Sequence, residues 1–67
     1  MVEITCNGEK RQVAEGVTVQ SMIVELGLEP DSVVAECDGA IVGRDAYETT
    51  PLKEGSVVEL IRFVGGG

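Results

Sequence analysis

Few side chains in this sequence could do chemistry, and the usual ones are missing. The 67-residue chain has no histidine and no tryptophan, so it lacks the commonest general base and the commonest metal ligand. Its two cysteines, Cys6 and Cys37, lie 31 positions apart and form no Cys-x-x-Cys motif. A four-cysteine iron–sulfur site or a Cys/His zinc site cannot form from these residues, and we expect no metal site. We interpret both thiols as small buried hydrophobic groups in a reducing compartment.

The segment most suggestive of chemistry is the glycine run Gly65, Gly66 and Gly67, which follows Phe63 and Val64. Glycine has no side chain and the widest backbone freedom, so composition alone allows two interpretations. One is a frayed terminus without a function. The other is a thin, flexible strip that delivers the carboxylate of Gly67 into a narrow active site on another protein. The four residues from Val64 would reach about 13–14 Å when extended.

Charge and hydropathy narrow the classes of partner. Twelve acidic and five basic residues give a net charge of −7, which argues against nucleic acids and anionic membranes, since both require a basic protein face. No apolar run is long enough to span a bilayer, and no charged-then-apolar leader follows Met1. Apolar residues make up 43% of the chain and charged residues 25%, as in globular domains. We expect a small cytoplasmic protein that is monomeric when free.

A tail of this kind needs a domain to hold it, and the first half of the sequence predicts a hairpin and a helix. Residues 2–6 alternate apolar and polar types as in a half-buried strand. Asn7-Gly8 is a strong turn signal before a return strand over 9–14. Thr18 is a plausible N-cap for a helix that ends before Gly27. One face of this helix carries an apolar stripe, formed by Val19, Met22, Ile23 and Leu26.

The second half of the sequence predicts three further strands. We expect strands over 33–37 and 40–42, an irregular polar segment over 44–50 with one helical turn near 45–47, and a last strand over 57–63. The order of elements predicts an α+β fold of the β-grasp type. In this fold one helix crosses a mixed sheet of four to five strands, and the first and last strands lie parallel at its centre. An OB or SH3 barrel is the competing interpretation, but the helix fits it less well.

The chain is expected to form one folded unit and a tail. We place the β-grasp domain at residues 1–64 and a flexible glycine tail at 65–67. In this fold the last strand runs between the strands that carry Cys6 and Cys37. Two inter-strand spacings separate the cysteines by about 9.6 Å, whereas a disulfide requires Cα atoms within about 7 Å. We therefore expect two free thiols.

Four features of the sequence occur together. They are the β-grasp order, the Asn7-Gly8 hairpin, the segment Ile41-Val42-Gly43-Arg44, and the stretch 52–60 that leads through Arg62-Phe63-Val64 into the glycines. In this combination the chain resembles the sulfur-carrier proteins of thiamine biosynthesis, the ThiS family. The resemblance covers the whole chain, and the terminal segment is its most specific part.

The resemblance implies a protein that is a co-substrate and not an enzyme. A partner resembling the ubiquitin-activating enzymes would bind ATP and adenylate the carboxylate of Gly67. A persulfide-derived sulfur would then convert the activated carboxylate into a thiocarboxylate, and thiazole synthase would accept this sulfur into the thiazole ring of thiamine. The chain itself would bind no cofactor, because ATP is used by the adenylating partner and every catalytic group belongs to the partners.

Strand alternation predicts a docking face on the side of the sheet away from the helix. Apolar residues exposed beside a reactive terminus are candidate interface anchors, although scattered surface hydrophobic residues are also common. An acidic border that includes Glu3 and Glu36 would speed docking to a basic partner. Arg44 is either a contact for a partner or a phosphate, or a solvated loop residue. The predicted docking residues are Val34, Glu59, Ile61 and Phe63.

Four alternatives stay open. The small subunit of molybdopterin synthase shares the fold and the thiocarboxylate chemistry, but its members tend to be longer and to have prolines just before the terminal glycines. Residues 63–65 contain no proline. A ubiquitin-like modifier joined to lysines and a sulfur carrier for cysteine or another pathway are the second and third alternatives. The fourth belongs to a different class, a β-grasp binding module whose glycine tail is inert.

Overall fold

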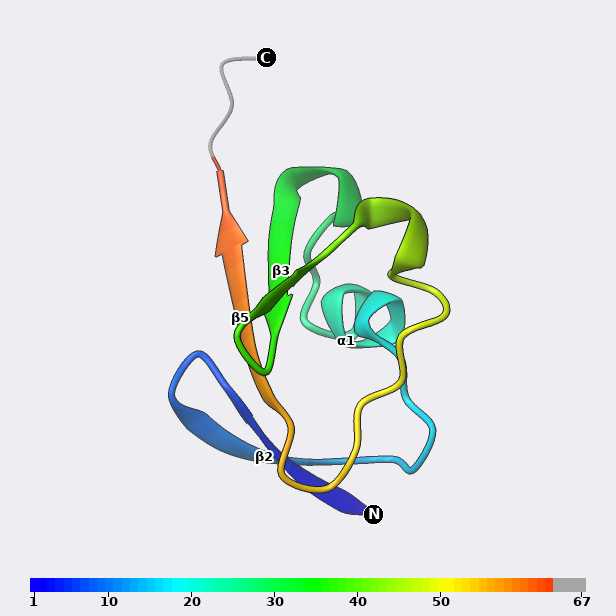
Figure 1. The fold of residues 1–67 in the computed structure, drawn as a ribbon, viewed down its shortest axis with the longest axis vertical. Helices are drawn as coiled ribbons and strands as arrows, with labels where there is room; N and C mark the ends of the chain where they lie inside the picture. The colour runs from blue at the N-terminus through cyan, green and yellow to red at the C-terminus, as the bar shows by residue number, and fades with distance from the viewer. Residues whose placement is uncertain (64–67) are drawn as a thin grey trace.

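The protein consists of a mixed five-stranded sheet packed against one α-helix (Figure 1). The computed structural model describes residues 1–63, so the predictions for Val64, Gly65, Gly66 and Gly67 lie outside the described residues. The elements in chain order are β1 Val2–Cys6, β2 Glu9–Val13, α1 Val19–Glu25, the 3₁₀ helix η1 Pro30–Ser32, β3 Val33–Cys37, β4 Ala40–Val42, the 3₁₀ helix η2 Arg44–Ala46 and β5 Val57–Arg62.

The topology of the sheet places the last strand at its centre. The strand order is β2-β1-β5-β3-β4, with β5 parallel to β1 and antiparallel to β3. This arrangement, with a helix on one face, confirms the predicted β-grasp fold. Val58 of β5 is the register partner of Cys6 on one side and of Cys37 on the other. Both cysteines are free, as the strand order predicted.

Asn7 joins the first hairpin to the central strand. It has a φ of 50° and is followed by Gly8 at 83°, as expected for a tight hairpin turn. Its backbone N–H donates to the Val58 carbonyl at 2.9 Å. Its side-chain Oδ1 accepts from the Leu60 N–H at 2.8 Å, and its Nδ2 donates to the Leu60 carbonyl at 3.3 Å. The Asn7 amide therefore continues the pairing of β5 beyond the end of β1.

The helix begins and ends as its sequence signals predicted. Thr18 is the N-cap, and its hydroxyl oxygen accepts from the Ser21 N–H at 3.2 Å. At the other end Gly27 has a φ of 78°, and the Leu28 N–H donates to the Ile23 carbonyl at 3.1 Å. None of the helices within residues 1–63 combines the length and the apolar content needed to span a bilayer.

The core lies between α1 and the inner face of the sheet. The helix contributes three buried residues, and the strands contribute the inward half of each alternation. Tyr47 and Leu52, from the long connection before β5, complete the layer at 2% exposure each. The core residues are Val2, Ile4, Cys6, Val13, Val19, Met22, Ile23, Val33, Ala35, Tyr47, Leu52, Val58 and Leu60.

The structure differs from the sequence prediction mainly at element ends and in the connections. β2 ends at Val13 and β5 at Arg62, each one residue earlier than predicted. The helical turn in segment 44–50 is η2, Arg44–Ala46. The 3₁₀ helix η1 was not predicted. It forms after Pro30, whose fixed φ suits the first residue of a helical turn.

Candidate functional site

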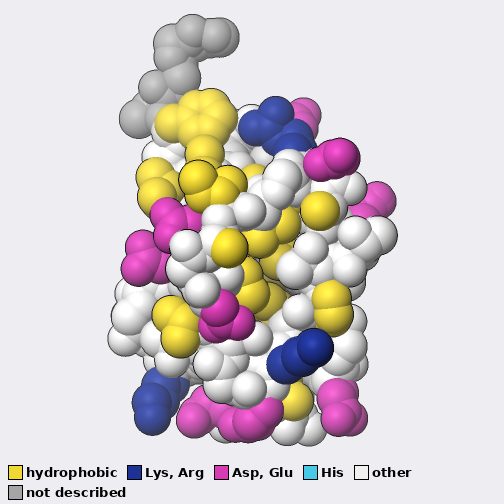
Figure 2. All heavy atoms as spheres, viewed as in Figure 1, with side chains coloured by type: hydrophobic (Ala, Val, Ile, Leu, Met, Phe, Trp, Pro, Cys, Tyr) yellow, Lys and Arg dark blue, Asp and Glu magenta, His cyan; other side chains and the backbone are white. Residues whose placement is uncertain are grey.

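The candidate docking surface is the face of the sheet opposite α1, near the end of β5. Val34 and Ile61 are register partners on β3 and β5, so their side chains share this face. Ile61 is 50% exposed and Phe63 47%. We call Val34, Ile61 and Phe63 the outer patch. Hydrophobic side chains gather at the end of the molecule where β5 ends (Figure 2).

Two of the three acidic residues predicted at the border of the outer patch lie beside it. Glu36 and Glu59 are register partners one step along the same two strands, and Glu59 is exposed. The prediction was wrong for Glu3. β1 runs parallel to β5 with Thr5 opposite Val57, so Glu3 lies near Gly55, before the start of β5 and away from Ile61, and its carboxylate is 3.9 Å from the Lys10 ammonium. The structure therefore places Val34, Glu59 and Ile61 on one face of the sheet, with the exposed Phe63 directly after the end of β5.

Two further apolar residues on this face were missed in the sequence. Ile41 of β4 pairs with Glu36 and is 73% exposed, and Val57 of β5 is 48% exposed. For Val57 the signal was available, because it precedes Glu59 and Ile61 in the same two-residue alternation. For Ile41 the strand has only three residues, too few for its alternation to assign a face.

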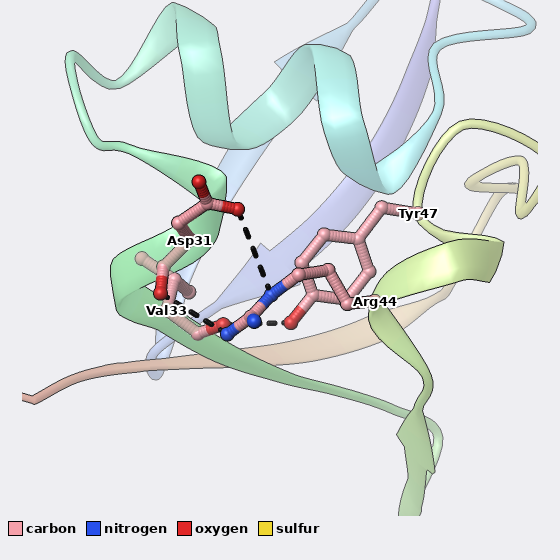
Figure 3. Close-up of polar contacts among 4 residues, drawn as sticks. All are labelled: Asp31, Val33, Arg44 and Tyr47. Carbon is pink, nitrogen blue, oxygen red and sulfur yellow. Dashed lines mark hydrogen bonds and ion pairs between the residues drawn. The ribbon is translucent and has the colours of Figure 1, made fainter.

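The end of β5 is attached to a hydrogen-bonded framework built from η1 and η2. The Phe63 N–H donates to the Ser32 carbonyl at 3.1 Å. The backbone carbonyl of the preceding residue, Asp31, accepts a hydrogen bond from Arg44 Nη2 at 3.0 Å. The Arg44 Nε also lies 3.9 Å from the Asp31 carboxylate (Figure 3). Arg44 thus holds the segment that fixes the last described residue of the chain.

Tyr47 supports the same segment from the inside. Its ring is buried, and its hydroxyl donates to the Val33 carbonyl at 2.6 Å (Figure 3). The carbonyls of three consecutive residues, Asp31, Ser32 and Val33, therefore each accept a bond from a different part of the chain. Tyr47 was missed in the sequence because segment 44–50 is polar overall and a single aromatic residue gives no periodic signal.

Neither thiol is suited to act as a nucleophile. Burial raises the pKa of the Cys6 thiol above its ordinary value of 9.0. Burial also raises the pKa of Cys37, with a further contribution from the neighbouring Asp38 carboxylate. Because the thiolate is the reactive form, both groups stay protonated and unreactive near neutral pH. Within residues 1–63 no three His, Cys, Asp or Glu side chains are grouped so that they could hold a metal ion.

The comparisons with known proteins assign the chain to a family. A family model described as the ThiS family matches residues 1–67. The chain belongs to the ThiS family. It is 34% identical over 50 residues to the sulfur carrier protein ThiS of Bacillus subtilis, which covers 75% of this chain and 76% of that protein. The resemblance drawn from the terminal segment and the β-grasp order is thereby confirmed.

Solved ThiS structures have the same fold. The crystal structure of the thiamine biosynthesis protein ThiS from Geobacter metallireducens superposes with a TM-score of 0.83 at 32% identity, covering 98% of this chain and all of that one (100%). Two thiazole synthases also match. The one from Magnetococcus marinus is 33% identical over 66 residues, 98% of this chain. The chain spans only about a fifth of the length of that enzyme (20%).

Proposed function

We propose that this ThiS-family chain is a sulfur carrier of thiamine biosynthesis and is itself not a catalyst. The observation that carries the proposal is the full-length family match, together with the name of the Bacillus subtilis relative, which is a sulfur carrier protein. The described residues are in keeping with this role, because Cys6 is buried, Cys37 is partly buried, and burial raises the pKa of both thiols. A carrier needs a rigid domain and an accessible reactive group, and its partners supply the catalysis.

In the proposed cycle the reactive group is the carboxylate of Gly67. A carboxylate is a poor electrophile, so a partner first transfers AMP to it from ATP. A carboxylate oxygen attacks the α-phosphorus, and pyrophosphate leaves. The outer sulfur of a partner's persulfide then attacks the carbonyl carbon and AMP leaves, which gives an acyl disulfide. A second thiol of the partner attacks the inner sulfur of this acyl disulfide, the S–S bond breaks, and a thiocarboxylate remains on Gly67 with a disulfide on the partner. Gly65 and Gly66 serve as the narrow strip that enters the partner's active site, because glycine has no side chain to exclude.

Thiazole synthase is the proposed acceptor of the sulfur. Segments similar to 98% of this chain occur within thiazole synthases of Magnetococcus marinus and Paramagnetospirillum magneticum. Joining two interacting modules in one polypeptide raises their effective concentration without any new contact. The presence of this domain inside those enzymes therefore supports a partnership when the two are separate proteins.

The outer patch is the proposed docking site for the adenylating enzyme. Its residues Val34, Ile61 and Phe63 are apolar and lie beside the strand end that leads to Gly67. Glu59 lies at its border and contributes to the attraction of a basic partner. Contact at this patch would hold the chain beyond Phe63 over the partner's active site. β5 would then both bind the partner, through Ile61, and direct the carboxylate of Gly67 toward the active site.

Deleting Gly67 tests the proposal. The truncated chain keeps the domain and still ends in two glycines, but its carboxylate is drawn back by about 3.5 Å. Misplacement of reacting atoms by even an ångström costs on the order of 100-fold in rate. We expect the variant to bind the adenylating enzyme, to support ATP–pyrophosphate exchange very poorly, and to gain no sulfur by intact mass. It should also fail to restore growth without thiamine in a strain that lacks the carrier.

The opposite outcomes separate the alternatives. Normal growth of that strain on the truncated chain would contradict the thiamine assignment. Normal adenylation of the truncated chain would show that Gly67 is not the reactive end. If the chain is instead a β-grasp binding module with an inert tail, the truncated chain and the intact chain would give the same result in both assays.

A further inference from the structure

The outer face of the sheet carries two carboxylates in direct register. Glu36 on β3 and Glu59 on β5 are antiparallel partners, and alternation places both side chains on the face away from α1. Side chains directly opposite each other on neighbouring strands have Cβ atoms about 4.5–5.5 Å apart, and like charges at this position destabilise a sheet. The free protein therefore holds an unfavourable charge pair at the centre of its exposed face.

No cation of the described chain compensates this pair. The two ion pairs within residues 1–63 are Lys10 with Glu3 and Arg44 with Asp31. Lys10 pairs with Thr5 in the β1–β2 register, and two strands, β1 and β5, lie between it and β3. No positive charge on the described residues therefore offsets the repulsion between these two carboxylates, and the net charge of the chain is −7.

Apolar side chains surround the pair on the same face. Ile61 and Val57 lie two residues to either side of Glu59 along β5, and Val34 lies two residues before Glu36 along β3. Ile41 is the neighbour of Glu36 on β4. Three of these four are about half exposed or more, at 48% for Val57, 50% for Ile61 and 73% for Ile41. Apolar contacts around a charged centre exclude water from it when a partner docks.

We propose that this face receives a partner surface in which an arginine side chain, ringed by apolar residues, lies across Glu36 and Glu59. The inference rests on the proposed function, since the partner it describes is the ATP-dependent adenylating enzyme. Charge complementarity selects a cation. The guanidinium group suits the site better than an ammonium because its planar fork of donors can serve two carboxylates at once.

The repulsion between Glu36 and Glu59, which destabilises the free protein, makes binding selective for a partner with a cation at this position. The cation removes the repulsion between Glu36 and Glu59, so the pair contributes to affinity both by contact and by relief of the repulsion. A partner that is apolar but lacks the cation would leave two carboxylates desolvated and unpaired, which is costly. The outer patch alone would accept many apolar surfaces, whereas the carboxylate pair restricts the choice.

The test compares full-length Glu36→Gln, Glu59→Gln and their double variant with the unchanged protein. Affinity for the adenylating enzyme of the same cell is measured by calorimetry, and thermal stability by melting. We expect each single substitution to weaken binding about tenfold or more. The double variant should lose less than the product of the two single losses, because the first substitution already removes the repulsion that the cation relieves.

Stability should move in the opposite direction from affinity. Relief of the repulsion should raise the melting temperature of the double variant by about 1–5 °C. A double variant Glu25→Gln with Glu48→Gln is the matched control, since it removes the same charge from exposed positions on or near the helix side. It should bind like the unchanged protein to within about twofold.

Two results would overturn the inference while leaving the sulfur carrier intact. One is an unchanged affinity of the Glu36 and Glu59 variants together with normal adenylation. The other is an equal loss of affinity in the control, which would indicate general charge attraction and no local contact. Absence of any binding between the unchanged protein and the adenylating enzyme would contradict the proposed function itself, and the inference would fall with it.

Discussion

Neighbouring residues of β5 lie in opposite environments, one in the core and the next on the exposed face. Mutations can therefore test the docking face separately from the core. Leu60 is 7% exposed and belongs to the core, whereas Ile61, the next residue, is 50% exposed. The cause is the two-residue period of a strand, which sends successive side chains to opposite faces of the sheet. A change of one position in the sequence therefore separates an effect on folding from an effect on binding.

We expect Ile61→Asp to fold and Leu60→Asp to unfold. An unpaired carboxylate at Leu60 would lie in the core and cost about 4 kcal/mol or more, comparable with the total stability of about 3–10 kcal/mol for a chain of this length. Ile61→Asp should cost less than about 1 kcal/mol, because the new carboxylate reaches water. Thermal melts of both variants measure the difference.

Binding of Ile61→Asp to the adenylating enzyme should be at least about tenfold weaker, as for an anchor residue at an interface. Val24→Asp is the control, since Val24 is 57% exposed on α1 and lies on the other side of the molecule. It should leave the affinity unchanged. If Ile61→Asp unfolds while Leu60→Asp folds, the assignment of faces along β5 is wrong.

At the scale of elements, the strands and the helix could be predicted because their signals are local. Thr18, Gly27 and the apolar stripe of α1 all lie within ten residues of one another, and Asn7-Gly8 marks its own turn. The long-range contacts of the turns and connections could not be predicted, because they join distant parts of the chain. Tyr47 reaches Val33, 14 positions away, and the side chain of Asn7 reaches Leu60, 53 positions away.

Tyr47→Phe tests the framework that holds the end of β5. The ring remains, but the buried Val33 carbonyl loses a partner at 2.6 Å, which should cost about 1–3 kcal/mol of unfolding free energy. Urea denaturation measures this cost. The amide of Phe63, which is bonded to Ser32 in the same segment, should also exchange its hydrogen faster.

Thr49→Ala is the matched control, because it removes a hydroxyl from an exposed site in the same connection. The change in unfolding free energy should be below about 0.5 kcal/mol. Equal stability of Tyr47→Phe and the unchanged protein would show that the hydroxyl adds nothing and that burial of the ring alone holds the segment.

At the scale of the whole molecule, charge balance predicts how stability responds to salt. The chain carries twelve acidic and five basic residues, so the compact state suffers net repulsion. The two ion pairs of the described chain are exposed and separated by 3.9 Å each, so they contribute little that salt could remove. We expect the melting temperature to rise as sodium chloride increases from about 10 mM to about 150 mM.

Potassium chloride should act like sodium chloride, since screening depends on ionic strength and not on the identity of the cation. A fall in melting temperature with salt would show that ion pairs outweigh the repulsion. A rise with one cation alone would indicate a specific ion site in place of screening.

The candidate site was predictable to the extent that it follows strand alternation. Val34, Glu59 and Ile61 lie on the face that alternation predicted, because β3 and β5 are long enough for the period to be read. Their role in docking, like that of Phe63, stays a prediction. The pairing of Glu36 with Glu59 required the register between two strands more than twenty residues apart. Register depends on turn geometry and on packing of the whole sheet, so it was accessible only from the structure.

The central position of β5 also determines how the protein responds to a mechanical load. β5 is bonded to β1 on one side and to β3 on the other, and it is the strand that runs toward the C-terminus (Figure 1). Its hydrogen bonds lie across the strand, so a pull on Phe63 along β5 loads both rows of bonds together, in shear, and does not open them one by one. The domain should therefore resist a load applied at Phe63 with the strength of two strand pairings at once.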